Sequence, residues 1–122
     1  MKASNTVYTS ESELLNKVIE WIEPQKRNGI VVLKIRDRYT SGYSDLFINA
    51  RGRFVVAELK DNEGTPTRQQ LDFIKSMKKA GGTGGVCRSV LDVSKLIDEA
   101  LYCVCESTGN DKYCSICGKE IK

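Results

Sequence analysis

The 122-residue sequence contains no histidine. Catalytic triads and dyads built on histidine, histidine general bases and histidine-ligated metal nucleases are therefore excluded. Chemistry has to rely on carboxylates, lysine, a thiol, or a metal ion held by oxygen or sulfur. No apolar run approaches the roughly 18 residues that cross a bilayer, and the N-terminus lacks the apolar segment of a secretion signal. We expect a cytoplasmic protein of a bacterium or phage-infected host, with reduced thiols and no membrane partner.

Net charge is also small. Lys and Arg number 19 and Asp and Glu number 16, which leaves a formal charge of +3. This value permits a nucleic-acid partner without requiring one. Length and composition fit one soluble domain with a small appendage. From Tyr102 onward the chain holds four of its five cysteines and little apolar periodicity, so we divide it into a domain at 1–101 and a Cys-rich tail at 102–122.

The hydrophobic pattern predicts an alternation of helices and strands. Apolar residues recur at helical spacing in the segments 10–23, 67–80 and 89–101. Runs of β-branched or alternating apolar residues predict strands at 30–36, 43–49, 53–60 and 83–89.

The second and third predicted strands are joined by a tight turn at Ala50, Arg51 and Gly52, so we expect them to be antiparallel neighbours. The third strand carries an apolar run from Phe54 to Ala57, which we expect to be buried on both faces. The order αβββαβα indicates a mixed α/β fold in which helices flank a central sheet.

Two acids and a lysine are expected to meet at the ends of these strands. Asp45 lies in the second strand, and Glu58 and Lys60 end the third on one face, because residues two apart in a strand project the same way. Two carboxylates suit Mg²⁺ without filling its coordination sphere, and the backbone carbonyl of Leu59 can add a third oxygen. Lys60 would then hold the attacking water or the phosphate.

Glu11 is expected on the buried face of the first helix, since it precedes Leu15 by four residues and Val18 by seven. An inward carboxylate needs a partner or a metal ion, and Glu11 would reach the strand-end cluster directly or through water. From the residues alone a plainer alternative stays open. A strand that ends in Glu-Leu-Lys is most often a solvated strand end.

The blocks SGYSDL, VVAELK and TRQQLDFIKSMKKAGG, in this order, resemble the VRR-NUC family, the virus-type replication-repair nucleases of the PD-(D/E)xK superfamily. The resemblance covers about residues 10–98. It implies a restriction-endonuclease-like core with a mixed sheet. Ser44 stands where the superfamily name has proline. The resemblance matches five residues to the family's catalytic positions: Glu11, Asp45, Glu58, Lys60 and Gln70.

By this resemblance the chain is a Mg²⁺- or Mn²⁺-dependent DNA endonuclease and a homodimer, selective for Holliday junctions or other branched DNA. Two-fold symmetry would let each subunit cut one of two equivalent strands. Arg36, Arg38 and Tyr39 stand shortly before Asp45 in the sequence and would contact flanking phosphates. Two alternatives remain: a non-catalytic DNA-binding or assembly module on the same fold, and a general nuclease without branch preference.

The tail carries Cys103-x-Cys105 and Cys114-x-x-Cys117, a spacing that predicts a structural Zn²⁺ site of four thiolates. About twenty residues cannot bury a core alone, so a metal ion would account for their order. A disulfide or free thiols are the alternatives. Cys87 is expected to be a thiol of the core, and Trp21 is expected to pack rather than to stack on a base.

Overall fold

The structure is a computed structural model that describes residues 2–34 and 46–102. Its elements follow the predicted order, with a 3₁₀ helix added: α1 (Glu11–Ile22), η1 (Glu23–Asn28), β1 (Ile30–Lys34), β2 (Leu46–Ala50), β3 (Arg53–Leu59), α2 (Arg68–Lys79), β4 (Thr83–Cys87) and α3 (Val90–Leu101). Within these residues no helix has the length and apolar character needed to cross a membrane.

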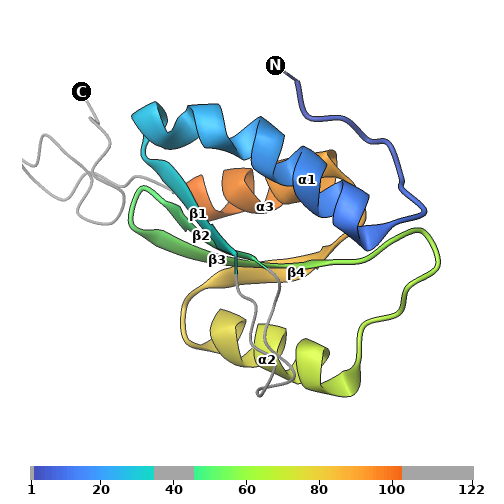
Figure 1. Cartoon of the computed structure of the whole chain (residues 1–122). Helices are drawn as coiled ribbons and strands as arrows, with labels where there is room; N and C mark the ends of the chain where they lie inside the picture. The colour runs from blue at the N-terminus through green and yellow to red at the C-terminus, as the bar shows by residue number, and fades with distance from the viewer. Residues whose placement is uncertain (1, 35–45, 103–122) are drawn as a thin grey trace, which may run out of the picture.

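The strands form one mixed sheet in the order β1-β2-β3-β4. β2 is antiparallel to β1 and β3, whereas β4 runs parallel to β3. The predicted hairpin is confirmed: Arg51 and Gly52 both have positive φ, at 53° and 86°, as a type I′ turn requires. Helices α1 and α3 cover one face of the sheet and α2 covers the other (Figure 1). The mixed α/β fold class is thereby confirmed.

Each α-helix begins where a hydroxyl side chain caps it. Ser10, Thr67 and Ser89 accept a hydrogen bond from the third backbone N–H that follows each of them. After α1 the chain continues as η1, because Pro24 is tolerated in the first turn of a helix. Gly29 then ends η1 with a φ of 82°.

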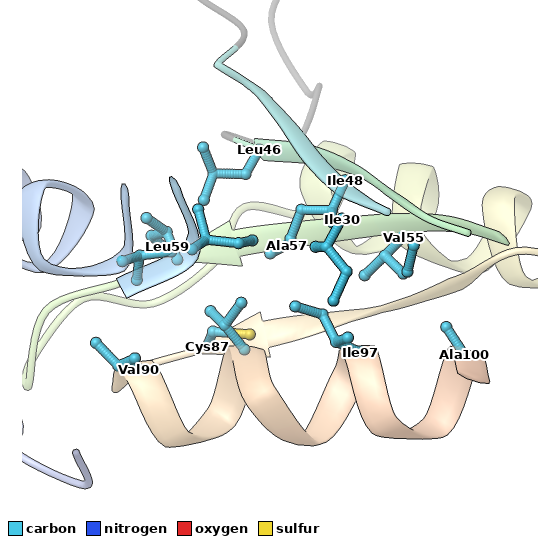
Figure 2. Close-up of a cluster of buried hydrophobic side chains, with 14 of the residues drawn as sticks. Ile30, Leu46, Ile48, Val55, Ala57, Leu59, Cys87, Val90, Ile97 and Ala100 are labelled. Atoms are coloured by element: carbon cyan, nitrogen blue, oxygen red, sulfur yellow. The ribbon is translucent and has the colours of Figure 1, made fainter. Parts of the chain in front are cut away.

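The core lies between the sheet and the layer of α1 and α3. The central strand β3 contributes Val55, Ala57 and Leu59 to it, and Cys87 of β4 lies beside them (Figure 2). Cys87 is buried, so the expectation of a core thiol is confirmed. The expectation for Phe54 is wrong. Its side chain is 40% exposed, because α2 packs mainly over β3 and β4, whereas the ring of Phe54 lies toward β2, against that of Phe47.

The glycine-rich strand β4 lets α2 lie close to the sheet. A Cβ atom added to Gly84 would stand 2.5 Å from Cγ2 of Val56 and 3.4 Å from Cγ2 of Ile74, the buried residue of α2. At Gly85, on the opposite face, the added atom would meet only the end of the Leu96 side chain, at 3.3 Å. Gly84 is thus required by close packing, whereas Gly85 is not.

We predict that Gly84→Ala lowers the free energy of unfolding by about 1–3 kcal/mol, because it overpacks the contact between Val56 and α2. Gly85→Ala is the matched control and should stay within about 1 kcal/mol of the wild type, because the Leu96 side chain can move. Urea denaturation of both variants measures this difference. Equal stability of the two variants would contradict the packing explanation.

Candidate functional site

Glu58 and Lys60 meet at the end of the central strand. Successive side chains of β3 alternate between the two faces of the sheet, and Val56, Glu58 and Lys60 share the face that α2 covers. The Glu58 side chain is fully buried, and its Oε1 lies 3.4 Å from Nζ of Lys60. The Lys60 side chain is only 12% exposed. The predicted convergence of these two residues is therefore present in the structure.

The burial of Glu58 and Lys60 argues against the alternative that they form only a solvated strand end. A charged carboxylate is costly to remove from water unless a charge or hydrogen bonds compensate it. A buried ion pair is weak evidence for stability, since its desolvation often exceeds its Coulomb energy. A solvated strand end would leave both side chains in water, and neither is. The burial of both side chains therefore argues against the solvated strand end.

The loop after Lys60 is fixed on several sides. The Lys60 backbone N–H donates to the carbonyl oxygen of Cys87 at 3.0 Å. The Asp61 carboxylate accepts from the backbone N–H groups of Glu63 and Gly64, at 3.0 and 2.6 Å. Arg88 donates from Nη1 to the Asp61 carbonyl oxygen at 2.6 Å. The backbone on both sides of the Lys60 side chain is thereby held in one arrangement.

The prediction that Glu11 lies on the buried face is wrong: Glu11 is exposed. It is the first residue of α1, and the buried stripe of that helix begins only at Leu14. A carboxylate in this first turn also interacts favourably with the helix dipole. Glu11 nevertheless lines a pocket of about 190 Å³ together with Leu59, the residue between Glu58 and Lys60. The structure thus brings Glu11 to the end of β3, on the face opposite to the Glu58 side chain.

Gln70 has a structural task at the start of α2. Its Oε1 accepts from the backbone N–H of Thr67 at 2.9 Å, and its own N–H donates to Oγ1 of Thr67 at 3.1 Å. These reciprocal bonds form a capping box. The spacing Thr-x-x-Gln before an apolar stripe would have revealed this cap from the sequence. The catalytic role of Gln70 stays a prediction.

The Cys87 thiol lies close enough to Glu58 for the charge of that carboxylate to affect its pKa. Burial raises the pKa of this thiol well above its usual range, and the negative charges of Asp92 and Glu58 raise it further. A thiol needs a depressed pKa to act as a nucleophile or a metal ligand at neutral pH. Cys87 therefore remains a protonated residue of the core.

Several predicted residues lie outside the described part of the chain, namely Asp45, Arg36, Arg38, Tyr39, Cys103, Cys105, Cys114 and Cys117. Leu46 follows Asp45 in the sequence and pairs with Ala57, the residue before Glu58. Over residues 2–34 and 46–102, no three Asp, Glu, Cys or His side chains form a group that would hold a metal ion. The donors at the strand end are carboxylate and carbonyl oxygens, and these hard ligands fit Mg²⁺ or Mn²⁺ by type.

Comparison with solved structures supports the assignment of the fold. A solved VRR_NUC domain matches the structure with a TM-score of 0.58 and 29% sequence identity, over 72% of this chain and 94% of that domain. This chain has a VRR-NUC-like fold. The match spans nearly all of the solved domain, so the resemblance seen in the sequence blocks extends to the arrangement of helices and strands. No family model and no curated protein matches the sequence. The VRR-NUC-like fold makes this chain a nuclease-fold domain.

Proposed function

We propose that this chain is a metal-dependent DNA endonuclease of the VRR-NUC type. One observation carries the proposal: in a VRR-NUC-like fold, a fully buried glutamate lies 3.4 Å from a nearly buried lysine at the end of the central strand. A carboxylate and an amine held in this way are the groups that phosphodiester hydrolysis needs when histidine is absent.

In the proposed site Asp45, Glu58 and the Leu59 carbonyl hold Mg²⁺ or Mn²⁺. The bound cation would acidify a water molecule and offset charge on the phosphate. Lys60 stabilises the negative charge that develops on the phosphate oxygens. Its burial makes this interaction stronger than it would be in bulk water, since the local dielectric is lower. Glu11, which lies beside Leu59 at the end of β3, and Gln70 are the two further residues that the family resemblance assigns to the site.

The proposed substrate is DNA, and branched DNA in particular, with Arg36, Arg38 and Tyr39 on the flanking phosphates. The proposed assembly is a homodimer. The edge strand β1 supports a protein contact, because Val31 and Leu33 are 50% and 60% exposed and exposed apolar strand edges invite pairing. The dimer stays a prediction that the molecular mass in solution tests.

The cleavage experiment uses a panel of linear, flapped, forked and four-way DNA, with Mg²⁺, Mn²⁺ or EDTA. We expect the wild type to cut with either metal ion and to favour branched substrates. Asp45→Ala, Glu58→Gln and Lys60→Ala should each reduce the rate by about 10²-fold or more, as the loss of one electrostatic catalytic group does. Matched controls are Glu13→Gln and Lys75→Ala, both exposed, and these should cut like the wild type.

The panel also decides between the alternatives. Equal rates on all substrates would indicate a general nuclease. Binding without cleavage under every metal condition would indicate a non-catalytic module. If Lys60→Ala and Lys75→Ala behave alike while both retain the circular dichroism of the wild type, the catalytic role of the Glu58–Lys60 pair is contradicted.

We also propose that Cys103, Cys105, Cys114 and Cys117 hold a structural Zn²⁺ ion, because four thiolates leave no open position for chemistry. Elemental mass spectrometry of the purified protein should find about one zinc ion per chain, and Cys117→Ser should lose most of it. Cys87→Ser is the control and should keep it, since Cys87 is buried in the core. A zinc-free protein with a disulfide in the tail would overturn this assignment.

A further inference from the structure

A second pocket, of about 250 Å³, lies between the N-terminal segment, α1 and the start of α3. Its lining combines aromatic and charged side chains: Lys2, Tyr8, Lys17, Glu20 and Trp21. In Figure 1 the N-terminal segment runs outside the helical layer and then turns into the start of α1. This pocket is separate from the strand-end site, and its combination of lysines and aromatic rings makes it a candidate ligand site.

Backbone hydrogen bonds fix the walls of this pocket. The N–H of Leu91, in the first turn of α3, donates to the carbonyl oxygen of Ser4 at 2.8 Å. The N–H of Asn62 donates to the carbonyl oxygen of Tyr8, also at 2.8 Å. Tyr8 and Trp21 are partly buried against the hydrophobic core. The expectation that Trp21 packs is therefore confirmed, and Trp21 also lines the pocket.

The chemistry of the lining selects a nucleotide. Aromatic rings stack on nucleobases irrespective of sequence, and lysine ammonium groups bind phosphate. Drug-sized ligands occupy pockets of about 300–1,000 Å³. A pocket of about 250 Å³ lies just below this range, so it suits a single base with part of its backbone and is too small for a base pair. Glu20, 3.8 Å from Lys17, adds an acceptor for the amino group of a base.

The pocket is tied to the strand-end site through the loop that follows Lys60. Asn62, which is bonded to Tyr8, stands two residues after Lys60. Since consecutive Cα atoms are about 3.8 Å apart, the Cα atoms of Lys60 and Asn62 are separated by less than about 8 Å. The pocket and Lys60 therefore lie near the same end of the sheet but on opposite faces, since the start of α3 follows Cys87, which pairs with Leu59. A DNA strand that joins them has to pass round this end of the sheet.

We propose that this pocket binds one unpaired nucleotide of the DNA strand that occupies the strand-end site, its base against Trp21 and Tyr8 and its phosphate on Lys17 and Lys2. This inference rests on the proposed nuclease function and deepens it. A nucleotide that must be unpaired would give the enzyme a physical reason to prefer branched or single-stranded regions over an intact duplex.

Trp21 is the single tryptophan of the chain, so its fluorescence reports on the pocket directly. The full-length protein is titrated in EDTA, which prevents metal-dependent cleavage, with a short single-stranded oligonucleotide, a blunt duplex of the same sequence, or dAMP. We expect the single strand to quench the fluorescence at much lower concentration than the duplex or dAMP.

Variants then test the lining. Lys17→Gln should weaken binding of the single strand and lower the salt dependence of log K by about 0.7, the value for one lost phosphate contact on single strands. Tyr8→Ala should weaken binding about tenfold, as the loss of one stacking ring does. Tyr8→Phe keeps the ring and should bind like the wild type. Lys95→Gln, an exposed lysine of α3 outside the pocket lining, is the matched control.

Three outcomes would overturn the pocket: no quenching by the single strand, equal binding by Lys17→Gln and Lys95→Gln, or dAMP binding as tightly as the oligonucleotide. Because Tyr8 packs on the core, thermal melting checks each variant, and Lys17→Gln keeps the test decisive if Tyr8→Ala unfolds. A failure of the nuclease proposal would give a result that differs from a failure of the pocket proposal. Quenching would then persist, while no DNA is cut with Mg²⁺ or Mn²⁺.

Discussion

The burial of the Glu58 carboxylate beside the Lys60 ammonium group constrains the rest of this structure. An ion pair on the surface would contribute little and would be easily lost, whereas a buried charge needs compensation that the surrounding chain must supply. The compensation here is a lysine two residues further along, held by a backbone hydrogen bond to Cys87 and by the Asp61 turn. A pair that costs desolvation and adds little stability is retained most simply for its chemistry.

The fold explains why this pair sits where it does. β3 is a central strand with the core on one face and α2 on the other, so a side chain near its end on the α2 face is shielded from water. Gly84 allows α2 to approach that face closely. Beyond Leu59 the sheet gives way to a loop that is bonded to both the N-terminal segment and Arg88. Charge is thus buried at the point where the chain leaves the sheet.

Much of the fold could be predicted from the sequence, because each element carries its own local signal. The apolar periods and the capping residues Ser10, Thr67 and Ser89 mark the helices, and Arg51-Gly52 marks the hairpin. The contact between Glu58 and Lys60 followed from the two-residue period of a strand. The family resemblance of the motif blocks also holds at the level of the fold, as the matching VRR_NUC domain shows.

Other features had no such signal. Helical periodicity predicts on which side Glu11 lies but not how far along the axis the core extends, so its exposure could not be foreseen. The pocket beside Trp21 depends on an N-terminal segment without periodicity and on hydrogen bonds between Tyr8 and Asn62 and between Ser4 and Leu91, which are distant in the sequence. The capping role of Gln70 did have a signal, because Thr67 stands three residues before it as in a capping box. The family resemblance assigned Gln70 a catalytic role instead.

The central claim is that the buried Glu58 carboxylate belongs to a cation site, and the binding of the metal ion itself tests it most directly. Isothermal titration calorimetry with Mg²⁺ and with Mn²⁺ would compare the wild type, Glu58→Gln and the exposed control Glu13→Gln. We expect saturable binding in the wild type and in Glu13→Gln, and its loss in Glu58→Gln, which keeps the shape of the side chain without its charge. Unchanged cation affinity in a folded Glu58→Gln protein would contradict the claim.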